Sequence, residues 1–123
     1  MRSALLIVNA DDLGTSEDTN HQIYALMATG VVRSATLIGN SPAFESAIAR
    51  VREFPQCSFG AHLNLTVMRP LAPSPDLEPV LDEHGHLSQR LWTSRLSRPL
   101  VHALERELTA LARHSPACTT LLS

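Results

Sequence analysis

Two adjacent carboxylates stand near the start of this sequence, directly after a short apolar run. The stretch reads NADDLG, in which Asp11 and Asp12 follow the apolar residues 4–8. Successive side chains point to opposite sides of an extended chain. One carboxylate can therefore face a metal ion while its neighbour faces a water molecule or a substrate. The pair is a candidate for proton transfer beside a metal.

Three further polar residues, Asn40, His62 and Asn64, extend this candidate site. Asn40 follows a second apolar run, and His62 and Asn64 alternate with Thr66 in the stretch HLNLT. Every second residue of a strand points to the same side, so we expect the side chains of His62, Asn64 and Thr66 to share one face of a strand. Ligands of parallel α/β folds bind at the carboxyl ends of the strands. We therefore predict that these residues and the aspartate pair meet at one rim.

The elements that must position these residues follow from the apolar pattern. The near-continuous apolar run at 4–10 predicts a strand buried on both faces, and 34–39 and 58–65 predict two more. Helices are expected between them, at 16–29 with Thr15 as its cap and at 42–54 with Ser41 as its cap. This order predicts an α/β fold in which a β-α-β-α-β unit forms a parallel sheet with right-handed crossovers.

We expect the whole chain, 1–123, to be a single partial domain whose core is 1–66. Residues 67–98 are rich in proline and predict a long excursion, and 99–113 predict a helix with one apolar stripe. The last ten residues, 114–123, form an atypical tail. With 123 residues the chain is well short of the roughly 250 residues of a complete (β/α)₈ barrel, so any barrel would be incomplete.

Each candidate residue also has an ordinary structural interpretation. An aspartate between a strand and a helix is often only a cap, and a lone histidine in a strand is more often packed than ligating. The convergence of His62 with the aspartate pair favours function. By contrast, His84 and His86 flank Gly85, and we interpret them as a turn joining two short strands rather than a metal pair. Trp92 is expected to pack.

Composition excludes several classes of function. The net charge of −2 provides no footprint for nucleic acid, and the absence of lysine excludes a lysine Schiff base. Cys57 and Cys118 form no C-x-x-C pair, so we expect them to fill the core in a reducing compartment. No apolar stretch approaches 18 residues, which predicts a protein that does not enter membranes. We predict a cytoplasmic location.

Four blocks of the sequence carry a resemblance to a known family. NADDLG, ALMATGVVRSATLIGNSPAFESAI, GAHLNLT and LDEHGHL stand in order within residues 4–108. Together they resemble the N-terminal blocks of the YdjC-like carbohydrate deacetylases, the chitooligosaccharide deacetylase family. The resemblance implies a divalent-metal hydrolase on a (β/α)-barrel fold, which removes acetyl groups from N-acetylated sugars or chitooligosaccharides.

The resemblance also implies roles for individual residues. Asp12 and His62 match metal ligands of the family, and Asp11 matches its catalytic base. We assign Asn40 and Asn64 on the same rim to substrate binding. Mixed oxygen and nitrogen ligation suits several divalent metals, with magnesium or zinc as the leading expectations. A metal held this way can polarise an amide carbonyl and activate water.

The sequence departs from the family at its end. Family members continue into a strand with an aspartate and alternating histidines, whereas this chain ends in LARHSPACTTLLS. We therefore expect an incomplete metal site, in the N-terminal portion of a deacetylase truncated or shifted out of frame near Leu111. A complementing chain or a homo-oligomer is an alternative source of the rest. The alternative functions are a non-catalytic remnant and, less favoured because lysine is absent, a receiver-type α/β domain.

Overall fold

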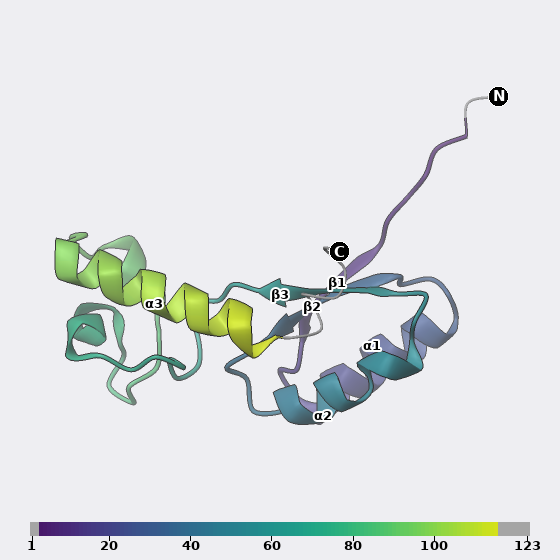
Figure 1. Ribbon diagram of the computed structural model, residues 1–123, viewed down its shortest axis with the longest axis horizontal. Coiled ribbons are helices and arrows are strands. Elements are labelled where there is room, and N and C mark those ends of the chain that lie inside the picture. The colour runs from purple at the N-terminus through teal and green to yellow at the C-terminus, as the bar shows by residue number, and fades with distance from the viewer. Residues whose placement is uncertain (1–2, 116–123) are drawn as a thin grey trace.

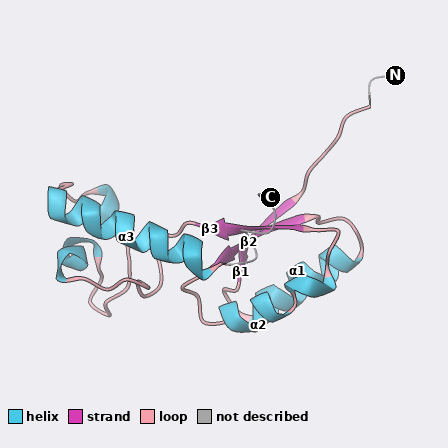
Figure 2. Ribbon diagram, in the orientation of Figure 1, coloured by secondary structure: helices cyan, strands magenta, loops and turns pink. Residues whose placement is uncertain are grey.

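The structure, a computed structural model, describes residues 3–115. Its sheet has three parallel strands in the order β1-β2-β3, as Figures 1 and 2 show. The strands are β1 (Asn9–Leu13), β2 (Ser34–Ile38) and β3 (Ser58–His62). Helices α1 (Glu17–Ala28) and α2 (Phe44–Ala49) form the connections. The predicted parallel β-α-β-α-β unit of an α/β fold is confirmed.

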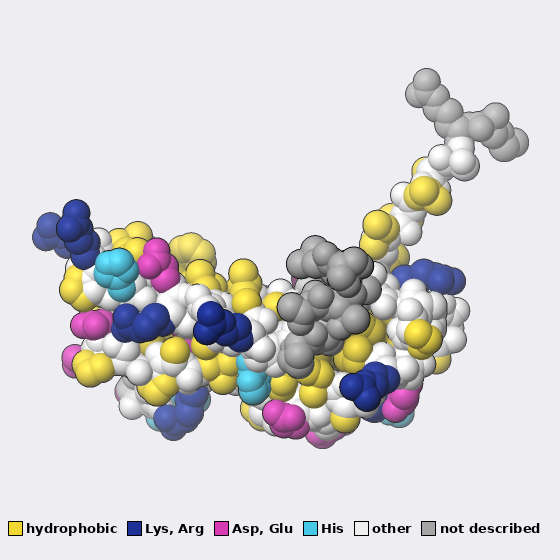
Figure 3. Space-filling model, in the orientation of Figure 1, with side chains coloured by type: hydrophobic (Ala, Val, Ile, Leu, Met, Phe, Trp, Pro, Cys, Tyr) yellow, Lys and Arg dark blue, Asp and Glu magenta, His cyan; other side chains and the backbone are white. Residues whose placement is uncertain are grey.

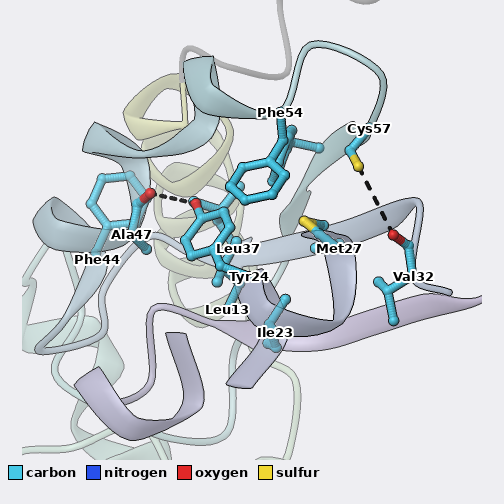
Figure 4. Packing of buried hydrophobic residues seen from close by; sticks show 12 residues of the cluster. Leu13, Ile23, Tyr24, Met27, Val32, Leu37, Phe44, Ala47, Phe54 and Cys57 are labelled. Atoms are coloured by element: carbon cyan, nitrogen blue, oxygen red, sulfur yellow. Dashed lines mark hydrogen bonds between the residues drawn. The ribbon is translucent and has the colours of Figure 1, made fainter. Parts of the chain in front are cut away.

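The main core lies between the sheet and the helices α1 and α2, which lie side by side on one face of it (Figure 1). Tyr24 is central to this core: its ring stacks on Phe54 with centroids 5.0 Å apart. Its hydroxyl donates to the Ala47 carbonyl, drawn as a dashed line in Figure 4. Cys57 is buried in the same cluster, as predicted, whereas Cys118 lies outside the described residues.

Both helices begin later than the sequence predicts. Ser16 caps α1, because its Oγ accepts from the Thr19 amide at 3.1 Å, while the hydroxyl of Thr15 donates to the backbone one turn earlier. Ser41 does not cap α2, because its hydroxyl donates to the Ile38 carbonyl at 2.6 Å. Local side-chain bonds thus compete with the capping role expected at both positions.

The first strand begins at Asn9 rather than at residue 4. Asn9 pairs with Ser34, the first residue of β2, so residues 4–8 extend past the end of the neighbouring strand. Leu5 and Leu6 are 98% and 87% exposed, and this segment projects away from the body in Figure 3. The apolar run is therefore not a buried strand here, because no other described strand lies beside it.

The third strand also ends earlier than predicted, at His62. The side chain of Asn64 then organises a turn, since its Oδ1 accepts from the amides of Thr66 and Val67 at 3.1 and 3.2 Å. The alternation expected through Asn64 and Thr66 does not extend beyond His62. Asn64 holds its place through this turn rather than through the strand.

The segment predicted as an excursion builds a second core with α3 (Arg98–His114). It contains two 3₁₀ helices, η2 (Pro75–Val80) and η3 (Gln89–Trp92). Figure 2 shows these turns beside α3, beyond the carboxyl ends of the strands. The buried side chains of this second core are Leu77, Val80, Leu87, Leu100, Ala103 and Leu104. The proline-rich stretch is therefore packed, although it contains no regular strand or α-helix.

The turn at residues 82–86 is as predicted, and the packing of Trp92 is not. Leu81 and Leu87 form a single antiparallel bridge across the turn, in place of the two short strands expected on either side of it. Gly85 in this turn has a φ of +76°, in the region that favours glycine. Trp92 is 76% exposed because it ends η3 on the surface.

Helix α3 is capped by Ser97 and contains a fully buried carboxylate. Glu107 is 0% exposed and accepts hydrogen bonds from the amides of Leu71 and Ala72 at 2.8 and 2.7 Å. The residue at the end of α3, His114, packs against the ring of Phe44. Residues 116–123 of the predicted tail lie outside the described residues. Within residues 3–115, no helix combines the length and apolar character needed to cross a membrane.

Candidate metal and catalytic site

The predicted aspartate pair and His62 lie together on the face of the sheet opposite α1 and α2. In β2, Ala35 and Leu37 are buried in the main core, so the alternating residue Thr36 faces the other way. The hydroxyl of Thr36 donates to Asp11 Oδ1 at 3.0 Å and lies 3.2 Å from His62 Nδ1. The three strands thus contribute to one polar cluster. The sequence predicts three of its members, Asp11, Asp12 and His62.

The conformation of the NADDLG turn determines where Asp12 points. Asp12 has a φ of +67°, and the register of β1 against β2 shifts between Ala10 and Leu13. Aspartate is among the few residues that tolerate this left-handed region. The amide and hydroxyl of Thr15 both donate to the Asp12 carbonyl, at 3.1 and 2.7 Å. The turn thereby directs two successive carboxylates differently, as the chemistry requires.

Asp12 and His62 form the pair that the sequence assigns to a metal. Asp12 Oδ1 lies 3.8 Å from His62 Nδ1, and their side chains are 60% and 33% exposed. Carboxylate oxygen and imidazole nitrogen are both common ligands of divalent metals. The two side chains are thus neighbours, and a shared ion would take Nε2 of His62 when Nδ1 donates to Thr36. Their exposure leaves room for a substrate.

Thr36 is a member of the site that the sequence analysis missed. A hydroxyl has one hydrogen, so Thr36 cannot donate to Asp11 and to His62 at once. When the charged carboxylate of Asp11 receives that hydrogen, Nδ1 of His62 must donate to Thr36, and Nε2 keeps its lone pair. Thr36 thus couples the orientation of a carboxylate to the tautomer of a histidine. Its outward position between Ala35 and Leu37 was the available signal.

Asn9 and Ser34 hold the same carboxylate from the other side. Asn9 Nδ2 donates to Asp11 Oδ1 at 2.8 Å, and the hydroxyl of Ser34 donates to Asn9 Oδ1 at 2.6 Å. Asp11 Oδ1 therefore accepts two hydrogen bonds, while Oδ2 has no partner within the described residues. The carboxylate is fixed through one oxygen and open at the other.

Asn40 and Asn64 are brought together with each other, and their hydrogen bonds go to a loop. Asn64 Nδ2 donates to Asn40 Oδ1 at 3.1 Å and to the Val67 carbonyl at 2.7 Å. Asn40 Nδ2 donates to the Arg69 carbonyl at 2.9 Å. Asn64 is 5% exposed, so these two amides stabilise the start of the segment that follows β3. Their binding of substrate stays a prediction.

The donor set fits a divalent metal in kind but is one ligand short. A catalytic zinc site has three protein ligands and one open position. Among residues 3–115, no group of three His, Cys, Asp or Glu side chains is arranged to hold a metal ion. Asp12 and His62 therefore supply two ligands, and the described part of the chain does not supply a third.

Comparison with known sequences shows the family of this chain. The sequence profile of the family described as YdjC-like protein matches residues 5–111. The chain therefore belongs to the YdjC-like family, as its sequence blocks predict.

Several curated relatives carry more specific names. Carbohydrate deacetylase 1 of Listeria innocua is 39% identical over 107 residues, which are 85% of this chain and 43% of that protein. For the carbohydrate deacetylase of Geobacillus stearothermophilus the identity is 41%, over 85% of this chain and 40% of that protein. A chitooligosaccharide deacetylase of Serratia marcescens is 40% identical over 72% of this chain and 34% of its own length.

A solved structure extends the match to the fold. A protein from Enterococcus faecalis V583, described as a cellobiose-phosphate cleavage protein, superposes with a TM-score of 0.73 at 25% identity. The superposition covers 92% of this chain and 44% of that one. The chain spans about two fifths of the length of the carbohydrate deacetylases from Listeria innocua and Geobacillus stearothermophilus. The arrangement of helices and strands is thus that of one part of a larger solved fold.

Proposed function

We propose that this protein is a metal-dependent hydrolase that removes acetyl groups from N-acetylated sugars or chitooligosaccharides. The observation that carries the proposal is the cluster of Asp11, Asp12, Thr36 and His62 on one open face of the sheet. It is supported by relatives that are named carbohydrate deacetylases and chitooligosaccharide deacetylase. The same chemistry accounts for two neighbouring carboxylates with different surroundings.

In this proposal, Asp12 and His62 hold a divalent cation, with magnesium or zinc as the leading candidates. The bound ion would polarise the amide carbonyl and make the attacking water more acidic. Asp11 takes a proton from that water through its open oxygen Oδ2, and then returns it to the nitrogen of the departing amine. Asn9 and Thr36 hold Oδ1 and keep the carboxylate oriented during both transfers.

The sugar would lie across the carboxyl ends of the strands. Asn40 and Asn64 are its proposed contacts there through the loop that their amides hold, since Asn64 itself is 5% exposed. Two hollows on the surface of the described residues, of about 630 and 460 Å³, are lined by other residues and not by the aspartate pair or His62. The metal site lies on the open face of the sheet. A third ligand could therefore reach it from elsewhere in the fold, from a complementing chain or from a second copy. A cytoplasmic location belongs to the same proposal.

A second candidate function is a non-catalytic fragment that shares the family's fold. One observation favours it: the described residues supply two ligands where a catalytic metal site has three. In that case the polar cluster would persist as a structural feature without binding a metal at useful concentrations.

The two candidates are separated by metal binding and by acetate release from the 123-residue chain. We expect calorimetry to detect binding of Zn²⁺ or Mn²⁺ that is lost in Asp12→Ala and in His62→Ala. Acetate release from N-acetylated chitooligosaccharides should then depend on added metal and be abolished by Asp11→Asn, which keeps the shape of the side chain. Absence of metal binding in the unsubstituted chain would favour the non-catalytic fragment.

A further inference from the structure

A buried asparagine lies next to the turn that carries Asp12. Asn20 is in the second turn of α1, is 4% exposed and makes three hydrogen bonds. We propose that Asn20 is a positioning residue, which fixes this turn and so places Asp12 against His62. The proposal rests on the proposed function only in taking Asp12 as a metal ligand.

The contact of Asn20 with the turn is direct. Asn20 Oδ1 accepts from the amide of Gly14 at 2.7 Å, two residues after Asp12. Gly14 has a φ of +101°, and a Cβ there would lie 2.8 Å from Ser41 Oγ, so no other residue fits this position without movement. The turn is thus pinned at a residue whose backbone conformation is itself restricted.

The amide group of Asn20 ties this turn to the second helix. Nδ2 donates to the Ala43 carbonyl at 3.0 Å and to Ser46 Oγ at 3.1 Å. The amide of Ala43 in turn donates to the Gly14 carbonyl at 2.9 Å. Ala43 immediately precedes α2, which follows β2, the strand that carries Thr36. Asn20 therefore links the turn after β1 to the turn after β2, and so relates Asp12 to its partners.

The burial of a polar side chain at position 20 needs a reason, because an apolar residue could fill the same space without the cost of burying an amide. A buried polar side chain is tolerated when its donors and acceptors are used, and Asn20 uses both ends. Asp12 also holds a left-handed conformation, which persists where the surroundings enforce it. Loss of the bond to Gly14 would leave that turn free to relax, and the carboxylate of Asp12 would move with it.

The chain offers a matched control for the test. Tyr24 lies one helical turn after Asn20 and also joins α1 to α2, since its hydroxyl donates to the Ala47 carbonyl. Tyr24→Phe removes this buried bond without touching the NADDLG turn. Asn20→Ala removes all three bonds, whereas Asn20→Asp keeps an oxygen that can accept from Gly14. The three variants separate loss of stability from loss of position.

Two readouts compare these variants: hydrogen exchange of the Gly14 amide and the affinity for Mn²⁺ measured by calorimetry. Relative to Tyr24→Phe, we expect Asn20→Ala to exchange the Gly14 amide at least about tenfold faster and to bind Mn²⁺ roughly tenfold more weakly. Asn20→Asp keeps the acceptor for Gly14 but loses the donor to Ala43 and Ser46, so it should lie between Asn20→Ala and the unsubstituted chain in both readouts.

Equal exchange of the Gly14 amide in Asn20→Ala and Tyr24→Phe would overturn the proposal, because Asn20 would then only stabilise the fold. Unequal exchange with equal Mn²⁺ affinity would also overturn it, since Asp12 would not depend on the turn. If the unsubstituted chain binds neither Mn²⁺ nor Zn²⁺, the proposed metal site fails, and the exchange of Gly14 still decides whether Asn20 fixes the turn.

Discussion

The sheet region, residues 9–62, and the α3 region, residues 64–114, each bury an apolar core but satisfy their backbone groups differently. In the sheet region the strands pair with each other along two parallel ladders. In the α3 region a single antiparallel bridge joins Leu81 and Leu87, and side chains bind much of the remaining loop backbone. The side chains that do so include Asn40, Asn64, Asp82 and Glu107.

This difference explains where polar residues are available for chemistry. Buried backbone amides need partners, so loops without a ladder commit their carboxylates and amides to structure. The strands of the sheet region satisfy each other, so that side-chain partners are needed at its turns, as Asn20 provides, and not along the ladders. Its polar side chains on the open face can therefore interact with each other. A polar substitution should therefore cost stability in the α3 region and alter the candidate site in the sheet region.

The largest effect on stability among the polar side chains is expected for Glu107. Glu107→Ala leaves two partly buried amides, those of Leu71 and Ala72, without their acceptor. Hydrogen bonds to a charged group contribute about 1.5–3 kcal/mol each, so the free energy of unfolding should fall by roughly 3–5 kcal/mol. Urea denaturation measures this change.

The control is Glu105→Ala on the exposed side of the same helix, where the side chain of Glu105 is 66% exposed. It should change the free energy of unfolding by no more than about 0.5 kcal/mol. If both substitutions had similar effects, the two amides would be satisfied in another way and the contrast between the regions would be wrong.

In the sheet region, Thr36→Val should change the site more than the stability. Valine has the shape of threonine and suits a strand, but it removes the hydroxyl between Asp11 and His62. We expect the free energy of unfolding to change by less than about 1 kcal/mol and Mn²⁺ affinity to fall roughly tenfold. Ring nitrogen NMR should show the neutral His62 losing its preference for a proton on Nδ1.

Thr36→Ser provides the matched control, because it keeps the hydroxyl and shortens the side chain by one methyl group. It should retain the tautomer of His62 and most of the metal affinity. The same tautomer in the valine variant as in the unsubstituted chain would mean that Thr36 does not determine which nitrogen of His62 is protonated.

The order of the elements was predictable because burial leaves a periodic mark on the sequence. Apolar spacing predicted the sheet with its two helices, and the stripe on residues 99–113 predicted α3 nearly to its ends. The start of β1 was not predictable, since an apolar run becomes a strand only where a partner lies beside it. At Ser41, a bond to the Ile38 carbonyl overrides the local capping preference.

In the candidate site too, residues that can be identified from their own segment were predicted, and residues that act through contacts between segments were missed. Asp11, Asp12 and His62 could be identified because their types and positions at strand ends are visible in the sequence. Thr36 acts through the pairing of β1, β2 and β3, which no single segment contains. Glu107 was missed because a glutamate in an amphipathic helix is rarely fully buried. Residues that act through long-range contacts leave little trace in the sequence.

The smallest effect is expected at Asp82, where the α3 region uses an exposed turn. The amides of His86 and His84 donate to Asp82 Oδ1 at 2.9 and 2.8 Å, and these bonds hold the pKa of its carboxyl below the ordinary value. A lowered pKa in the folded state adds stability above the unfolded value, about 3.9, which is lost as pH falls through the folded pKa.

Asp82→Asn keeps an oxygen that accepts both bonds but does not titrate. The difference in free energy of unfolding between the aspartate and asparagine forms should therefore shrink as pH falls below about 4, where the aspartate takes up a proton. Asp82→Ala, which removes the acceptor, should be less stable than Asp82→Asn at neutral pH. A difference that grew below about pH 4 would mean that the two amides do not favour the charged carboxylate. Asp82 would then not stabilise its turn in the way that Glu107 stabilises the loop at Leu71 and Ala72.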